Sequence, residues 1–251
     1  MTAERSGFPS RPARPQDGTR VDPPGLAVPE PVRTVRPAVP ASLRGVIAAL
    51  AAVSMLAVVA LSLAFHGEHG PDPFDRPVTA AVRAAWPQAG IVAYIVDGVA
   101  EPVPAAIIVA ALVVGCMLAK WWRLAVVAAV GPLSAAATAI VLKPLVMRTI
   151  HGDNLAFPSG HTAFATAVAL LLGLILIGLF RLGRVVGGAV VAGLALVAGA
   201  VMSVNQVVLD AHYPSDTVGG FFTAAAVVSV AALLTDAIAG LRAHRSSAEA
   251  G

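Results

Sequence analysis

Two short polar segments carry residues that could take part in chemistry, and each lies beside a long apolar run. The first is residues 157–162, where Pro158, Ser159, Gly160 and His161 precede an apolar stretch. Serine is a favoured helix N-cap, so we expect His161 in the first helical turn, beside free N–H groups and the positive end of the helix dipole. That arrangement suits an anion and places a proton donor beside it. Taken alone, the segment could also be an ordinary capped helix with an incidental histidine.

The second polar segment contains His212 and Asp216, which are four residues apart. On a helical turn this spacing puts the carboxylate on the same face as the imidazole, where it can hold one ring nitrogen and leave the other free. A purely structural pair at the membrane interface is the alternative. Upstream of both segments, Lys143 and Arg148 follow another apolar run and could supply positive charge.

These segments together resemble the type 2 phosphatidic acid phosphatase superfamily of integral membrane lipid phosphatases. Its signature has three blocks: a lysine followed seven residues later by Arg-Pro; Pro-Ser-Gly-His; and Ser-Arg, five residues, His, three residues, Asp. Lys143, the block at 158–161, His212 and Asp216 match it. The chain departs from it at both arginines, where Ile150 and Gln206 stand, and at their neighbours, where His151 and Asn205 stand. The resemblance covers about residues 43–240.

The resemblance implies a mechanism without a metal or another cofactor. His212 would be the nucleophile that forms a phosphohistidine, and Asp216 would orient it. His161 would protonate the leaving oxygen, because the unperturbed pKa of histidine, about 6.5, lies near working pH. Ser159 and the Gly160 N–H would hold the phosphate oxygens.

The missing arginines weaken the expected phosphate site. Loss of one preorganised donor typically costs roughly 10²–10³ in rate. Lys143 remains, and Arg148 is the candidate substitute at Ile150, because residues two apart point the same way in an extended segment after a break at Pro144. A snorkelling arginine at a helix end is the alternative for Arg148. No substitute for Gln206 is visible, and Asp210 adds negative charge nearby.

Composition indicates a membrane protein. The chain has 251 residues, of which 57% are hydrophobic and 12% charged, and its mean hydropathy is +0.81. The sequence pI of about 9.6 could suggest nucleic acid, but the basic residues fall in the N-terminal tail and at the ends of apolar runs, so we expect no nucleic-acid partner. The single cysteine, Cys116, excludes an intramolecular disulfide.

We expect an all-α fold, a six-span transmembrane helical bundle. Its domain would cover residues 43–240, with spans of about 20 residues at 44–65, 103–119, 124–143, 162–180, 185–204 and 217–238. Residues 1–42, rich in proline and arginine, are expected to form a disordered cytoplasmic tail, and residues 241–251 a second cytoplasmic tail. The amphipathic segment Pro77–Trp86 could lie in the interface as a rim or lid.

Charge predicts the orientation. With a cytoplasmic N-terminus, thirteen of the seventeen Lys and Arg residues lie inside, and both termini are cytoplasmic. The outside receives Arg76, Arg83, Lys143 and Arg148. Both motif segments then reach the outer face of the plasma membrane. His66, His69 and His151 also lie there, but no metal-ligand spacing links them.

The sequence therefore favours a membrane phosphatase acting on a lipid phosphate or a prenyl diphosphate, in the cell envelope. A catalytically weakened member that binds phospholipid headgroups or scaffolds envelope proteins is the second hypothesis, and the missing arginines favour it. A transporter is the third, since ionisable residues in spans often mark pathways, but Lys143, His161 and His212 lie at span ends. The vanadate-dependent haloperoxidases share the signature but are soluble. The exact lipid and the oligomeric state stay open.

The charge asymmetry yields a test of sidedness. A cysteine placed at Asp153 should react with a membrane-impermeant thiol reagent in intact cells, because the predicted topology puts that loop outside. A cysteine at Leu182, between Arg181 and Arg184, should stay unlabelled. Labelling at Leu182 but not at Asp153 would invert the topology.

Overall fold

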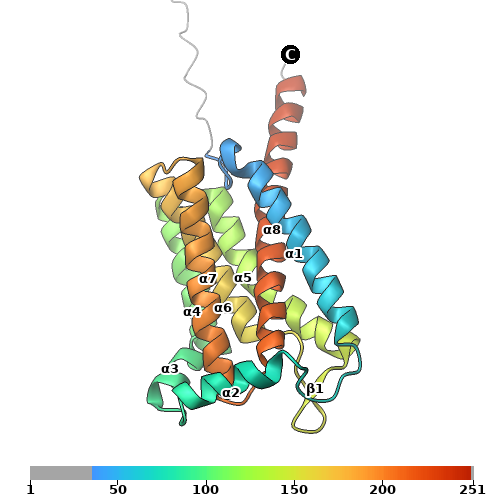
Figure 1. Ribbon diagram of the computed structural model, residues 1–251. Helices are drawn as coiled ribbons and strands as arrows, with labels where there is room; N and C mark the ends of the chain where they lie inside the picture. Colours follow the sequence, from blue (N-terminus) through green and yellow to red (C-terminus); the bar gives the residue numbers. More distant parts are fainter. Residues whose placement is uncertain (1–35, 250–251) are drawn as a thin grey trace, which may run out of the picture. The chain divides into compact units, whose positions relative to one another are not determined.

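The computed structural model describes residues 36–249 (Figure 1). Most of the tail expected to be disordered, residues 1–42, lies outside the described residues. Its last part, however, is ordered: the backbone N–H groups of Ala38 and Val39 each donate to the Asp236 carboxylate at 2.9 Å. The expected C-terminal tail also differs, because the last helix continues to Glu249.

The described chain is almost entirely helical, which confirms the predicted all-α class. A short 3-10 helix η1 (Ala41–Leu43) leads into α1 (Arg44–Ala64), α2 (Asp75–Ala85), α3 (Ile91–Gly98), α4 (Pro102–Leu118), α5 (Trp122–Val146), α6 (Gly160–Phe180), α7 (Arg184–Val208) and α8 (Pro214–Glu249). Two strands, β1 (Thr149–Ile150) and β2 (Asn154–Leu155), pair antiparallel between α5 and α6.

Five helices are long and apolar enough to cross a membrane: α1 together with η1, α5, α6, α7 and α8. The remaining expected span, 103–119, corresponds to α4, which has 17 residues. Helices α3 and α4 meet the same criteria only as a pair, bent by 56°. The break has a local cause, since Pro102 occupies the first position of α4 and cannot donate a backbone hydrogen bond to continue α3. The structure therefore has five spans, or six if the bent pair counts as one.

The predicted break at Pro144 is wrong, because α5 continues through this proline to Val146. One missing N–H in the last turn removes a single backbone hydrogen bond, which the packed helix tolerates. The helix ends instead at Met147, whose φ of 57° lies in the left-handed region. The chain then turns into β1, so Arg148 follows the helix end directly.

Helix α6 lies at the centre of the bundle and packs against α5, α7 and α8, while α8 also packs along α1 (Figure 1). The core where these helices meet contains many small side chains, among them Ala163, Ala167 and Ala224, all fully buried. Small residues allow close helix approach in lipid, where van der Waals packing drives association.

Two glycines at the start of α8 allow this helix to approach the loop before α6. A Cβ added at Gly219 would lie 2.3 Å from the Phe157 ring, and one at Gly220 would lie 2.4 Å from the Ser159 carbonyl oxygen. Contact with a backbone carbonyl cannot be relieved by a side-chain rotation. The motif at residues 157–161 therefore lies against α8 only because no side chain intervenes at Gly219 and Gly220.

This contact predicts that Gly220→Ala destabilises the protein. Overpacking typically costs about 1–3 kcal/mol, so the thermal midpoint of the purified protein in detergent should fall. Gly240→Ala on the same helix is the matched control, because a Cβ there meets nothing within 4 Å. If the two variants melted alike, the close approach would not matter.

Candidate active site

The two polar motif segments and the β1–β2 hairpin meet at one end of the bundle, where α2 also lies (Figure 1). Backbone hydrogen bonds join them. The Ser159 N–H donates to the Asp216 carbonyl at 2.9 Å, and the Ala156 N–H donates to the Arg148 carbonyl at 2.8 Å. Residues distant in sequence are thus held in one site.

A buried ionic network around Arg148 forms the base of this site. Arg148 Nη1 donates to Asp216 Oδ1 at 2.8 Å and to Ser215 Oγ at 2.6 Å, and Nη2 donates to Asp75 Oδ2 at 2.6 Å. The side chains of Arg148, Asp75 and Asp216 have no exposed surface. The guanidinium also lies 4.1 Å from the centre of the Phe65 ring. The network therefore connects β1, α2 and α8.

This burial changes the role expected for Arg148. Direct phosphate contact does not fit a guanidinium whose terminal nitrogens are occupied by carboxylates and closed to solvent. The physical reason is Asp75 on α2, a partner that lies far upstream in sequence. Ile150, where the signature has arginine, is itself buried in β1. The structure thus places Arg148 against Asp216, away from solvent.

His212 lies on the loop between α7 and α8, with its Nδ1 3.7 Å from Asp216 Oδ2. This exceeds hydrogen-bond length, but catalytic contacts are often loose without substrate. Asp216 itself is fixed, because Oδ2 accepts the Tyr213 N–H at 2.9 Å and Oδ1 accepts from Arg148. Burial lowers the pKa of His212, and the Asp216 carboxylate opposes that shift. A neutral imidazole is the form that a nucleophile requires.

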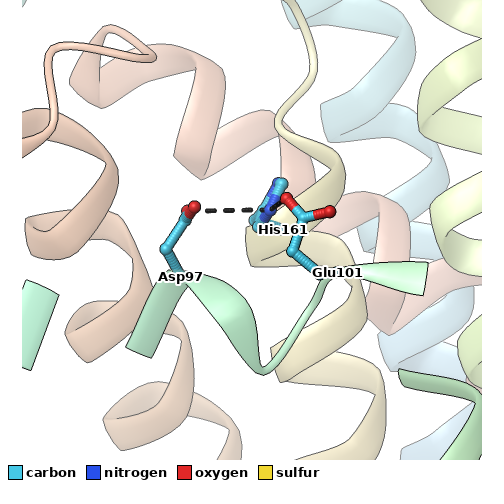
Figure 2. Close-up of side chains that lie close together, drawn as sticks. All are labelled: Asp97, Glu101 and His161. Carbon is cyan, nitrogen blue, oxygen red and sulfur yellow. Dashed lines mark ion pairs between the residues drawn. The ribbon is translucent and has the colours of Figure 1, made fainter. Parts of the chain in front are cut away.

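His161, the second residue of α6, lies between two carboxylates (Figure 2). Its Nε2 is 3.6 Å from Asp97 Oδ1 and 3.6 Å from Glu101 Oε1. Asp97 comes from the end of α3, and Glu101 precedes the first residue of α4. Neither residue was predicted from the sequence as part of the site, because the two lie on either side of the bend between α3 and α4 and no local pattern places them beside His161.

Asp97, Glu101 and His161 are also the residues that could hold a metal ion. One ligand atom from each lies within 4.8 Å of the others, and carboxylate and imidazole are ligands that zinc accepts. The two carboxylates give this side of the site negative charge, which would attract a cation.

Gln206 stands where the signature has arginine, and it is 1% exposed. Its Nε2 donates to Asp97 Oδ1 at 2.6 Å. Because glutamine is neutral, it orients the Asp97 carboxylate without neutralising it. The substitution thus leaves the negative charge of Asp97 directed at His161.

The remaining predicted residues lie in the same region. Ser159 is fully buried as the N-cap of α6, and its Oγ accepts from the Thr162 N–H at 3.4 Å. Gly160 begins α6, and a Cβ there would meet nothing within 4 Å, so space is available beside its N–H. Lys143 lies in the last turn of α5, and its charge and that of His161 both act on His212.

Three other polar residues form contacts at the edge of this region. His69 Nδ1 lies 2.8 Å from Thr149 Oγ1, and His151 Nε2 lies 2.9 Å from the Asp210 carbonyl oxygen. Asp210 also pairs with Arg83 of α2, and both side chains are half exposed. The loop histidines thus have individual partners and form no common ligand set among residues 36–249.

Comparison with known families supports the sequence resemblance. The family model of the PAP2 superfamily matches residues 142–238, from the last turn of α5 into α8. The matched segment contains both motifs and the lysine before them. No curated protein and no solved structure matches the chain.

The Arg148 network predicts a loss of stability rather than a simple loss of activity. Arg148→Ala would leave two buried carboxylates without a counter-charge, which typically costs about 3–5 kcal/mol. We expect a large fall in the thermal midpoint in detergent. Arg83→Ala is the control, because its pair with Asp210 is half exposed and such pairs contribute about 0–1 kcal/mol. An Arg148→Ala protein that melted like the parent but had lost activity would restore the direct phosphate role.

Proposed function

Residues 142–238 match the family model of the PAP2 superfamily, and from that premise we propose that the chain is a membrane phosphatase. It hydrolyses a lipid phosphate or a prenyl diphosphate through a phosphohistidine intermediate. The family supports phosphatase-type action on lipid or related phosphates. The assignment of residues to steps is our proposal.

The observation that carries the proposal is the placement of His212. It is buried beside a carboxylate that three separate groups hold in position: the Arg148 guanidinium, the Tyr213 N–H and the packing of α8. Lys143 and His161 are close enough for their charges to act on it. A nucleophile, an orienting carboxylate, a proton donor and a cation thus meet at one end of the bundle.

The first step transfers the phosphoryl group to the protein. Because Asp216 faces Nδ1 of His212, Nε2 is the nitrogen that attacks phosphorus. The bond between phosphorus and the leaving oxygen breaks, and His161 gives its proton to that oxygen. Asp97 Oδ1 and Glu101 Oε1 each lie 3.6 Å from Nε2 of His161.

The second step regenerates the protein. His161, now neutral, takes a proton from water, and the water oxygen attacks the phosphohistidine. The N–P bond breaks and inorganic phosphate leaves. Lys143 and the N–H groups at the start of α6 stabilise the charge of the phosphoryl oxygens in both steps.

We place this site on the extracytoplasmic face of the plasma membrane. The distribution of Lys and Arg supports that orientation, since the end of the bundle with the site carries four of the seventeen. A lipid substrate would enter from the outer leaflet. Its tail would remain among the apolar helices.

A catalytically weakened protein that binds phospholipid headgroups is the second candidate. The observation that favours it is the Gln206–Asp97 contact. Gln206 stands where the signature has arginine, and its neutral amide donates to the Asp97 carboxylate instead of supplying positive charge for a phosphate. Such a protein would bind the phosphate without turnover. Variants of His212, His161 and Asp216 separate the two candidates.

The proposal predicts that His212→Ala abolishes phosphate release from lipid monophosphates and prenyl diphosphates by the purified protein. His161→Ala should slow substrates with poor leaving groups most, and Asp216→Asn should lower the rate by orders of magnitude while the protein stays folded. Hydrolysis that persisted in His212→Ala would exclude this nucleophile. A parent protein that bound these lipids without releasing phosphate would support the headgroup-binding candidate.

The pH profile gives a further readout of the same variants. Burial lowers the pKa of His212, so its imidazole stays neutral at pH values below about 6.5, the ordinary histidine pKa. The decrease of kcat/KM on the acid side of the pH profile should therefore occur below that pH. Asp216→Asn removes the carboxylate that raises the pKa of His212, so it should move this decrease to a still lower pH. Comparing the two proteins on one substrate cancels the titration of the substrate itself.

A further inference from the structure

Helix α2 presents a basic face to a cavity beside His212. Arg76, Thr79 and Arg83 are spaced at i, i+3 and i+7, which places them on one side of a helix. They line a cavity of about 580 Å³ whose opposite wall contains His212 and Tyr213. The sequence analysis assigned these arginines only to the outer side of the membrane.

The cavity has an excess of positive charge. Arg76 has no ion-pair partner within residues 36–249, whereas Arg83 pairs with Asp210. Asp210 is the only acidic residue in the wall, and it lies near His151 as well. Among the described residues that line the cavity, the two arginines outnumber the single carboxylate.

The position of this face is fixed by the network that holds Asp216. Asp75, the first residue of α2, accepts hydrogen bonds from Arg148 Nη2 at 2.6 Å and from the Ser215 N–H at 2.8 Å. Arg76 follows Asp75 directly, so its backbone is held relative to α8 and His212. The basic face is thus part of the same framework as the candidate nucleophile.

We infer that Arg76 and Arg83 form a phosphate-binding subsite beside His212. The inference rests on the proposed function for its place in turnover. The subsite supplies, from α2, positive charge that Ile150 and Gln206 do not provide. Its ligand is a phosphate group, which comes either from a second phosphate on the substrate or from the inorganic phosphate released by the reaction.

Binding tests the subsite without requiring turnover. Inorganic pyrophosphate and inorganic phosphate are titrated by calorimetry into the full chain in detergent. Arg76→Ala should weaken the binding of at least one of them about tenfold, because it removes a charged hydrogen-bond donor to the anion. Arg76→Lys, which keeps the charge, should recover part of the affinity. Arg184→Ala, at the first residue of α7, is the matched control and should bind like the parent.

Kinetics then identify the source of the phosphate group. If the group belongs to the substrate, Arg76→Ala raises KM for a prenyl diphosphate about tenfold and leaves KM for the monophosphate unchanged. If it is the product, both KM values stay constant and the inhibition constant of inorganic phosphate rises about tenfold.

Two outcomes would overturn the subsite: a parent protein that binds neither anion, or an Arg76→Ala protein that binds both like the parent. If the parent hydrolyses its substrate and Arg76→Ala changes nothing, the subsite fails and the proposed function stands. If Arg76→Ala weakens anion binding in a parent without turnover, the proposed function fails and the subsite stands.

Discussion

The buried contact between Arg148, Asp75 and Asp216 is the constraint on which the rest of the site depends. Removing three charges from water is costly, and one guanidinium cannot neutralise two carboxylates. Hydrogen bonds reduce the imbalance: Asp75 accepts the Ser215 N–H and hydroxyl, and Asp216 accepts the Tyr213 N–H. The Phe65 ring adds a cation–π contact. Such a network exists only when β1, α2 and α8 are all in place.

This constraint separates two tasks that arginine performs at phosphate sites. One is direct contact with the anion, and the other is orientation of the groups that react with it. The contacts of Arg148 fit the second task, because its side chain is closed to solvent. It holds Asp216, which lies beside His212, and Asp75 at the start of α2, the helix whose Arg76 lines the adjacent cavity. The buried network thus ties the helix between the first two candidate spans to the motif segments.

The bend between α3 and α4 has a comparable effect on the opposite side. A continuous helix would bury its apolar face in lipid along its whole length, but the break leaves Asp97 and Glu101 at the level of His161 (Figure 2). Gln206 holds Asp97 without neutralising it. Two carboxylates thus lie beside the candidate acid, His161, and one carboxylate, Asp216, lies beside the candidate nucleophile, His212.

The sequence by itself determined the features that depend on local order. Apolar length predicted the helices, the serine before Gly160 predicted the start of α6, and the spacing of His212 and Asp216 predicted their proximity. These follow from hydrogen bonding and periodicity within a few residues. Only the tertiary structure decided which charges meet. Asp75 lies 73 residues before Arg148 and Asp97 lies 109 residues before Gln206, and no local pattern specifies such a pairing. The continuation of α5 through Pro144 was decided in the same way, because packing of the whole helix outweighs one lost hydrogen bond.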